Sequence, residues 1–414
     1  MTAPAADQMN GATVDLANLV EETSGVRSRI ARAVAARAED VLGLSRRLHA
    51  DPELSFEEHR ASAAISALLE RSGFTVERGA GGLPTAFTAT AGGGRLTVGI
   101  CVEYDALPGV GHACGHNLIA GAGVGAALGL LPVADELGIT VKVIGTPAEE
   151  HGGGKSILLE RGVFDGVAMA MMVHPFQEGL SYNPVGTTSQ AVGRYRATFR
   201  GRASHAATAP HLGVNAADAA VIAQVAVGLL RQQLPGDHRV ALVVSEAGRA
   251  TNIIPDTAVV DFECRAFTLP EYEALIARVR RCFEAGALAT GAVLEMSPTE
   301  PLYEPLVHDE GLCARWGEAI GFFGHDVEPG AELGGGSTDM GNVSRVIPSI
   351  HPWVGVPGCG VPIHTHEFAA VADSPQAYDL MLECAIAMGW TAAAVMADPG
   401  EVQRLLDGAG ERRA

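Results

Sequence analysis

The sequence predicts an α/β fold in which a central mixed sheet with flanking helices is interrupted by a smaller inserted α+β unit. Three short apolar strand patterns, at residues 96–102, 140–145 and 167–173, alternate with helical patterns, as in an α/β sheet. The pattern then changes at about residue 191 and returns after about residue 303. With 414 residues, of which 47% are hydrophobic, the chain exceeds the size at which one core usually divides into domains.

The larger predicted domain comprises residues 21–190 and 304–414. Residues 1–20 lack a basic, apolar leader pattern and are expected to be disordered. Amphipathic helical patterns follow at residues 24–49 and 57–72, on either side of an Asp-Pro-Glu break. Residues 118–134 are apolar but rich in Gly and Ala and interrupted by a proline, so they indicate a buried helix and not a membrane span.

The inserted unit comprises residues 191–303 and is expected to be a ferredoxin-like lid. It shows strands and helices in the order β-α-β-β-α-β. The expected elements are strands at residues 195–199, 240–244, 258–267 and 292–297 and helices at residues 216–230 and 270–289.

Composition excludes several classes of partner. The formal net charge is -19, with 48 acidic against 29 basic residues, so the chain offers no broad basic surface for nucleic acid or anionic lipid. We therefore expect neither nucleic acid nor membrane partners. The seven cysteines are odd in number and irregularly spaced, which argues against a secreted disulfide framework and favours a cytoplasmic location.

Polar residues that can bind metal follow each of the three strands. The motif Glu103-Tyr-Asp-Ala-Leu-Pro continues into His112-Ala-Cys-Gly-His116, a later strand precedes Glu149-Glu150-His151, and the third ends at His174. Thiolate and imidazole ligands suit zinc or a neighbouring first-row ion. In a pair of adjacent carboxylates, one can bind metal while the other transfers protons. The sequence therefore predicts a metal site with a general base beside it.

The ordered motifs resemble the M20 family of metallopeptidases and amidohydrolases, with closest similarity to its amidohydrolase branch. The resemblance covers nearly the whole chain from about residue 40, and the strand-end motifs are similar to those of aminobenzoyl-glutamate hydrolases and β-alanyl-lysine dipeptidase-like proteins. The chain departs from the commoner branch pattern at Asn117, where that pattern has Asp. The further motifs that carry the resemblance are Pro147-Ala-Glu-Glu150, His174-Pro, Gly201-Arg-Ala-Ser-His-Ala206, Asn252-Ile-Ile-Pro255 and His364-Thr-x-x-Phe368.

The resemblance implies a two-metal amide hydrolase with a zinc-exopeptidase-like catalytic domain. Two ions, zinc or manganese, would be bridged by the Cys114 thiolate, with His116 and Glu150 on one side. The full implied ligand set is Cys114, His116, Glu150, His174 and His364. Glu149 would be the general base and acid.

Four further residues receive roles from the resemblance. His205, in the lid, would stabilise the oxyanion after lid closure or from a second subunit, which makes a homodimer the expected assembly. Arg265 would pair with a substrate carboxylate, and Asn252 would hydrogen-bond the substrate amide or carboxylate. Asp105 would orient a metal-binding imidazole or steady the metal-binding loop. Two interpretations without a catalytic role compete with these: His205 is a surface residue, and Arg265 is an ordinary ion-pair residue on its strand.

Several histidines compete for the metal positions, and the sequence is compatible with more than one reaction. His366 competes with His364 for the last metal position, and His112 and His151 flank the site as hydrogen-bonding residues or ligands. The leading hypothesis is a hydrolase of small N-acyl amino acids or aminobenzoyl-glutamate-like conjugates. The runner-up is a dipeptidase acting on β-alanyl-lysine-like dipeptides. A non-catalytic member that only binds metal or ligand is the third possibility, although a binding protein has no need of the Glu149 carboxylate.

Overall fold

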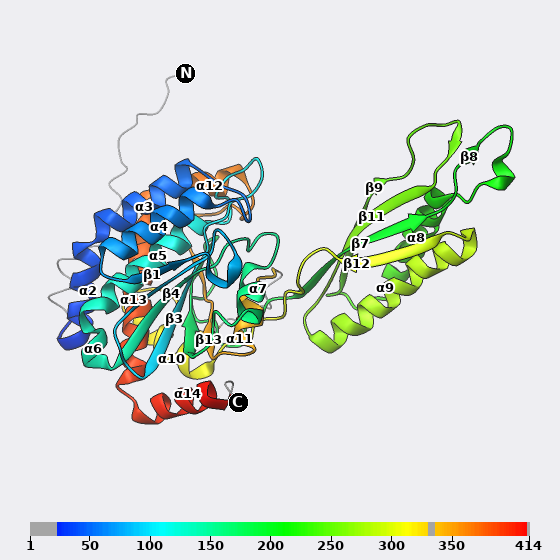
Figure 1. Cartoon of the computed structure of the whole chain (residues 1–414). Coiled ribbons are helices and arrows are strands. Elements are labelled where there is room, and N and C mark those ends of the chain that lie inside the picture. Colours follow the sequence, from blue (N-terminus) through cyan, green and yellow to red (C-terminus); the bar gives the residue numbers. More distant parts are fainter. Residues whose placement is uncertain (1–22, 330–335, 412–414) are drawn as a thin grey trace, which may run out of the picture.

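The computed structural model describes residues 23–329 and 336–411, which form a large α/β domain and a separate lid joined by two chain crossings (Figure 1). The first 20 residues, expected to be disordered, lie outside the described part of the chain.

The large domain is built on a six-stranded mixed sheet with the order β1-β2-β4-β3-β5-β13. The strands β3, β4, β5 and β13 are parallel, while β1 and β2 form an antiparallel edge. The central strands are buried along most of their length, as expected for parallel strands covered on both faces. The predicted mixed sheet is confirmed. Its strands are β1 (Thr75–Arg78), β2 (Phe87–Ala91), β3 (Leu96–Val102), β4 (Ile139–Gly145), β5 (Val167–Met171) and β13 (Ser349–Ile350).

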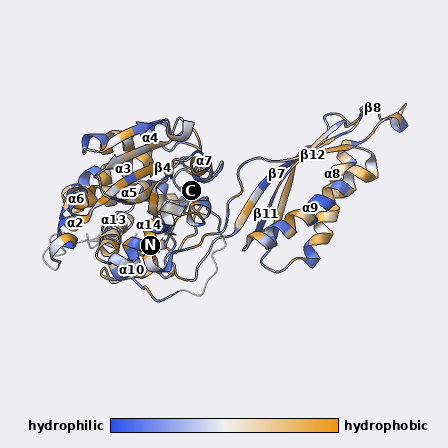
Figure 2. Cartoon of the chain, turned by 60° about the horizontal axis from the view of Figure 1, so that its bottom comes forward, coloured by the Kyte–Doolittle hydropathy of each residue, from blue (hydrophilic) through white to orange (hydrophobic). Residues whose placement is uncertain are grey.

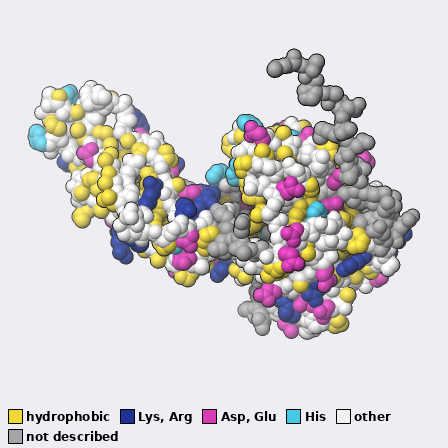
Figure 3. Space-filling view, turned by 180° about the vertical axis from the view of Figure 1, so that it is seen from behind, with side chains coloured by type: hydrophobic (Ala, Val, Ile, Leu, Met, Phe, Trp, Pro, Cys, Tyr) yellow, Lys and Arg dark blue, Asp and Glu magenta, His cyan; other side chains and the backbone are white. Residues whose placement is uncertain are grey.

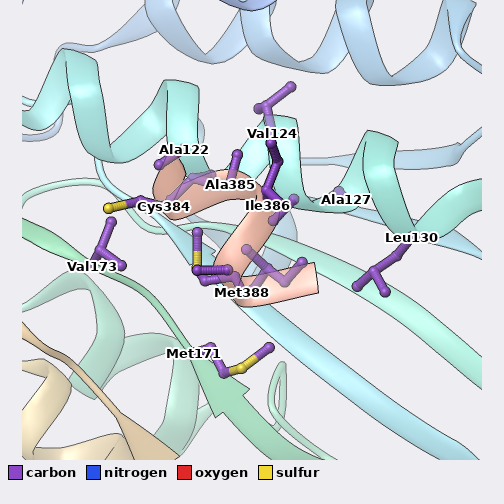
Figure 4. Packing of buried hydrophobic residues seen from close by; sticks show 14 of the residues in the cluster. Ala122, Val124, Ala127, Leu130, Met171, Val173, Cys384, Ala385, Ile386 and Met388 are labelled. Atoms are coloured by element: carbon purple, nitrogen blue, oxygen red, sulfur yellow. The ribbon is translucent and has the colours of Figure 1, made fainter. Parts of the chain in front are cut away.

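Helices flank this sheet, and two of them form the centre of the core. Every residue of α5 (His116–Leu130) is buried. It packs against α13 (Pro375–Met396), with Ala122 and Val124 close to Ala385 and Ile386, and with Met388 toward β5 (Figure 4). Both helical segments are apolar and long enough to cross a membrane, yet 89% and 78% of their most apolar windows are buried inside the protein. They are therefore core helices in this structure.

The first helical pattern differs from its prediction. The run expected at residues 24–49 is two helices, α2 (Gly25–Ala36) and α3 (Ala38–Ala50). Arg37 has φ -115° and ψ 7°, which is outside the helical region and ends the first helix. The other elements of this domain are α4 (His59–Arg71), α6 (Ala134–Leu137), α7 (Gly154–Glu160), β6 (His174–Phe176), α10 (Glu310–Gly321), α11 (Met340–Ser344), β14 (Trp353–Gly355), α12 (His366–Val371) and α14 (Pro399–Glu411).

The lid has its own sheet and its own core. Its antiparallel strands follow the order β12-β7-β11-β9, and the aromatic rings of Phe199, Phe262 and Phe283 stack between the sheet and a helix. Buried and half-buried residues alternate along β11, and Figure 2 shows both hydrophobic and hydrophilic residues along the lid strands. The predicted ferredoxin-like arrangement is confirmed. Its elements are β7 (Ala191–Arg200), α8 (Ala216–Leu230), β9 (Arg239–Glu246), β11 (Thr257–Ala266), α9 (Leu269–Thr290) and β12 (Val293–Pro298).

A pair of short strands, distant in the sequence, forms the tip of the lid. Strand β8 (Ser204–His205) pairs antiparallel with β10 (Ile253–Ile254). In Figure 1 this pair lies at the end of the lid farthest from the large domain.

Candidate metal centre

The candidate site lies at the carboxyl ends of three neighbouring parallel strands. Glu103 follows β3, Glu149 follows β4, and His174 follows β5. Because parallel strands end at the same edge of a sheet, these side chains converge there. The loop after β3 adds Cys114 and His116, of which His116 begins α5.

Gly115 allows Cys114 and His116 to reach the same site. Its φ is 75°, in the left-handed region, and a Cβ atom at this position would lie 2.4 Å from the Pro175 ring. Only glycine fits without strain, so the turn places the thiol and the imidazole on one side of the helix start.

Two groups of candidate ligands share the Cys114 thiol. In one group Cys114, His116 and His174 bring their ligand atoms within 4.8 Å of one another, and in the other Cys114 is grouped with Glu150 and His364. The Sγ atom lies 3.4 Å from His174 Nε2 and 3.3 Å from His364 Nε2. His116 Nε2 also lies 3.9 Å from Glu150 Oε1, so the expected pairing of these two residues on one ion stays a prediction.

Hydrogen bonds fix the two buried imidazoles with Nε2 toward the site. His116 Nδ1 donates to the Asp105 backbone oxygen at 2.8 Å and to its carboxylate at 3.1 Å. His174 Nδ1 donates to the Pro175 carbonyl at 2.8 Å. Each Nε2 is therefore the nitrogen that faces the site, and it can bind metal when the ring is neutral.

Asp105 orients His116 and also holds the next loop. Its second carboxylate oxygen accepts hydrogen bonds from Ser55 Oγ at 2.8 Å and from the Glu150 backbone N–H at 3.1 Å. Burial by itself raises the pKa of Asp105, but the hydrogen bond and charge of His116 outweigh it and lower the pKa to about 2. Asp105 is therefore ionised, which strengthens its hydrogen bond with the His116 imidazole.

The residues present fit divalent cations. His116 Nε2 and Glu150 Oε1 are buried without a hydrogen-bond partner, and such atoms usually indicate a missing partner. Burial and the Glu150 carboxylate raise the pKa of the Cys114 thiol, so a thiolate at this position requires a neighbouring cation. Sulfur, nitrogen and oxygen donors together suit zinc and other first-row ions.

Glu149 lies beside the two groups without belonging to either. Its carboxylate is 3.8 Å from His116 Nε2, and it forms a third, overlapping group with Glu103 and His116. Burial, followed by the negative charges of Glu103 and Glu150, raises the pKa of Glu149 well above its usual value. The carboxylate is therefore able to hold a proton in this environment.

A buried lysine that none of the sequence motifs indicated lies behind these carboxylates. Lys155 Nζ lies 2.5 Å from both Glu103 Oε1 and Asp339 Oδ1, and all three side chains are fully buried. The two acids keep the lysine charged although burial opposes it. A further missed residue is His351, whose ring is 5.5 Å from that of His174 and whose two nitrogens lack hydrogen-bond partners. The local signal for Lys155 was the run of three glycines that precedes it, shortly after the Glu149-Glu150 pair.

The flanking candidates lie outside the ligand groups of the described residues. His112 is buried with its ring 6.4 Å from that of His49, and burial lowers its pKa to about 3. His151 is 63% exposed, with Nδ1 3.9 Å from Glu300. His364 lies in a ligand group with Cys114 and Glu150, whereas His366 at the start of α12 lies in none of the groups of the described residues, so geometry favours His364.

Asn117 faces the helix packing and not the ligands. Its amide nitrogen donates to Ser45 Oγ at 3.0 Å and to the Ala372 carbonyl at 2.9 Å. An amide supplies these donors and a carboxylate would not, which gives Asn at this position a structural reason.

The structure separates the lid residues from the ligand groups. His205 is exposed in β8, and Figure 3 shows histidine side chains at the surface of the lid tip. Asn252, also exposed, accepts a hydrogen bond from Ala206 N–H through its backbone oxygen. Strand β7 separates this tip from the large domain by about 30 Å, at roughly 3.3 Å per residue.

Arg265 lies at the opposite end of the lid sheet from these two residues. It pairs with Val192 near the start of β7, and its guanidinium donates to Glu263 at 2.8 Å and to Ser337 at 3.2 Å. The single chain thus does not bring Arg265 together with Asn252, and its guanidinium already has a carboxylate partner.

Comparisons with known proteins agree with the fold and with the candidate metal site. Residues 188–290 match the peptidase dimerisation domain of the M20 family. The chain is 38% identical to a Xaa-Arg dipeptidase of Mus musculus over 90% of both chains. It is 32% identical to one of the subunits of the p-aminobenzoyl-glutamate hydrolase of Escherichia coli K12, over 59% of this chain and 54% of that protein.

A solved structure supports the metal assignment at the level of the fold. A dinuclear metal-binding peptidase of the M20 family from Bacillus subtilis is 25% identical, with a TM-score of 0.60 over 85% of this chain and 98% of that chain. Sequence, fold and ligand groups agree. The chain belongs to the M20 family and is a metal-dependent hydrolase that acts on amide bonds.

Proposed function

We propose that this enzyme binds two divalent ions, zinc or manganese, and hydrolyses the amide bond between an acyl or aminoacyl group and an amino acid. One observation about the adjacent residues Glu149 and Glu150 carries the proposal. Glu150 lies in a ligand group with Cys114, whereas Glu149 is buried beside it and belongs to neither of the two groups that contain Cys114. Metal-assisted hydrolysis requires these two roles, metal binding by one carboxylate and proton transfer by another.

The chain's own residues divide the reaction between them. Ions held by Cys114, His116, Glu150, His174 and His364 supply Lewis acidity and lower the pKa of water. Glu149 accepts the proton of the attacking water, and its raised pKa allows it to keep that proton until it passes it to the leaving amine.

We further propose a homodimer in which His205 of the partner subunit completes each site. His205 Nδ1 accepts the backbone N–H groups of Ala207 and Thr208 at 3.2 Å, so the neutral ring carries its proton on the exposed Nε2. That atom is a donor of the kind that stabilises an oxyanion. Its position at the far tip of the lid suits a neighbouring site better than its own, and the matched dimerisation domain supports a dimer.

The names of two relatives narrow the range of candidate substrates. Two relatives that cover 90% or more of this chain are named Xaa-Arg dipeptidases, from Mus musculus and Homo sapiens. This favours dipeptides with a basic C-terminal residue, including β-alanyl-lysine, as the second candidate beside N-acyl amino acids and aminobenzoyl-glutamate. Seven free cysteines support a reducing, cytoplasmic location.

A substrate panel tests the proposal. Wild type and Glu149→Gln are loaded with zinc or manganese and assayed on N-acyl amino acids, aminobenzoyl-glutamate, β-alanyl dipeptides and Xaa-Arg dipeptides. We expect the same metal content in both proteins and a turnover loss of about 10²- to 10⁴-fold in the variant.

Glu383→Gln is the matched control. It makes the same chemical change at a half-buried carboxylate that pairs with His325 outside the site, and it should leave turnover unchanged. Full activity of Glu149→Gln would overturn the role of Glu149. If metal-loaded wild type hydrolysed no substrate of the panel, the proposed reaction would be replaced by a binding role.

A further inference from the structure

The segment that leads back from the lid runs beside the first lid strand. The backbone N–H groups of Tyr303 and Val192 each donate to the other's carbonyl at 3.0 Å, and Thr299 N–H donates to the Arg194 carbonyl at 3.0 Å. The Arg194 guanidinium also lies over the Tyr303 ring, 5.5 Å from its centroid. Residues 299–303 and the start of β7 therefore form one paired hinge.

The loop that carries the two adjacent carboxylates has an unusual backbone. Ala148 has a positive φ of 59°, and Gly152 and Gly153 have φ values of 121° and 67°. A non-glycine residue in the left-handed region is strained and persists only when its surroundings hold it. The turn at residues 148–153 lies outside helices and strands, so side chains must supply much of that restraint.

The hinge supplies two of the side chains that hold this loop. Tyr303 Oη donates to the backbone carbonyl of Glu149 at 2.7 Å and accepts from Gly153 N–H at 2.9 Å. Glu300 accepts from Gly152 N–H at 3.0 Å while it pairs with Arg194. Tyr303 is 1% exposed, and burial raises its pKa, so the phenol stays protonated and remains a donor.

We propose that Tyr303 is a positioning residue for Glu149 and that it ties the lid hinge to the catalytic loop. The inference rests on the proposed role of Glu149 as the general base. The peptide group between Glu149 and Glu150 has a second anchor, since its N–H donates to Asp105 at 3.1 Å. Loss of the Tyr303 hydroxyl therefore leaves this peptide group held by Asp105 alone and frees its carbonyl end, next to the Glu149 side chain.

The test is Tyr303→Phe, which removes one hydroxyl and leaves the ring, its contact with Arg194 and the backbone pairing with Val192. We expect kcat to fall about five- to tenfold, as for the loss of one hydrogen bond, with KM and metal content within about twofold of wild type. Hydrogen exchange over residues 147–154 should become faster. This exchange readout does not depend on turnover.

Tyr272→Phe is the matched control. It removes the hydroxyl that Tyr272 shares with Tyr195 at 2.7 Å inside the lid, away from the catalytic loop. It should lower the free energy of unfolding by a similar amount without changing kcat or exchange over residues 147–154. If Tyr303→Phe does not fold, Glu300→Ala tests the same tie between hinge and loop, because it removes the acceptor for Gly152 N–H and should likewise speed exchange over residues 147–154 and lower kcat.

The two proposals fail in different ways. Unchanged kcat and unchanged exchange in Tyr303→Phe would overturn the positioning role while Glu149→Gln still abolishes turnover. An active Glu149→Gln enzyme would overturn the proposed base, whatever Tyr303→Phe does. Equal losses of kcat in Tyr303→Phe and Tyr272→Phe would reduce Tyr303 to a stabilising residue.

Discussion

Glu58 shows how a residue outside the ligand groups supports the site. It is fully buried, and one carboxylate oxygen accepts the backbone N–H of Phe56 at 2.9 Å and that of Ala148 at 2.8 Å. Phe56 and Ala148 both have positive φ values, so this one carboxylate restrains two strained backbone positions. Its other oxygen is buried without a hydrogen-bond partner.

This residue makes stability depend on pH. Burial, with a smaller contribution from the charge of Asp105, raises the pKa of Glu58 from 4.5 to about 7. A carboxyl group with a raised folded-state pKa contributes stability that is fully present below pH 4.5 and lost as the pH rises through about 7. The change is roughly 3 kcal/mol at about 1.4 kcal/mol per pKa unit.

Glu58→Gln should remove this dependence, because glutamine keeps the oxygen acceptor and does not ionise. Urea unfolding of wild type and Glu58→Gln at pH 5 and pH 8 measures it. We expect the stability of wild type relative to the variant to fall by roughly 3 kcal/mol from the lower to the higher pH. An equal difference at both pH values would show that the pKa of Glu58 is not raised.

At the scale of elements, the turn into α5 determines whether Cys114 and His116 reach the same site. Gly115→Ala places a Cβ atom 2.4 Å from Pro175 in a residue with φ 75°. We expect a loss of about 1–3 kcal/mol in the free energy of unfolding and weaker metal binding, because the turn must shift. Thermal unfolding with and without zinc checks both effects.

Gly43→Ala provides the opposite case. Gly43 lies inside α3, and no atom lies within 4 Å of a Cβ atom built there. It should stabilise the protein by roughly 0.5–1 kcal/mol through helix propensity without affecting metal binding. Similar behaviour of the two variants would mean that Gly115 is not required by its backbone conformation.

The elements also show what the sequence could predict. Strands β3, β4 and β5 could be predicted because each is an apolar run that precedes polar ligand types. Helix α5 could be predicted from its length and apolar composition, and the lid strand β11 from its alternating pattern. Local pattern could not reveal that Arg37 leaves the helical region, nor that β13 is a strand of two residues, because neighbouring packing decides both.

Long-range contacts were the part of the site that the sequence did not reveal. Lys155 and Asp339 are 184 residues apart, and Tyr303 meets Glu149 across 154 residues. Neither pair has a spacing that a motif could carry, since the fold alone brings them together. The candidate ligands could be predicted because their motifs are short and ordered along the chain.

At the scale of the whole molecule, the separation of the lid tip from the ligand groups predicts sites shared between two chains. Glu149→Gln and His205→Ala are each expected to inactivate the homodimer. Mixing the two after dissociation should restore about a quarter of wild-type activity, because about half of the dimers are mixed and each of those has one intact site. Activity of the mixture is measured after reassociation.

The controls follow from the same geometry. Each variant dissociated and reassociated alone should stay inactive, and sedimentation should show dimers in every sample. A mixture that stays inactive while mixed dimers form would contradict the shared site and would place His205 over the site of its own chain or outside the reaction.

The central claim is that the Cys114, His116, Glu150, His174 and His364 cluster holds two ions that hydrolysis requires. The most direct test is to remove metal with a chelator, add back zinc or manganese in steps, and measure bound metal and turnover together. We predict that turnover disappears with the metal and returns fully at two ions per chain, and that Cys114→Ser binds less metal and stays inactive. Full turnover in metal-free protein, or Cys114→Ser with wild-type metal content and activity, would contradict the account.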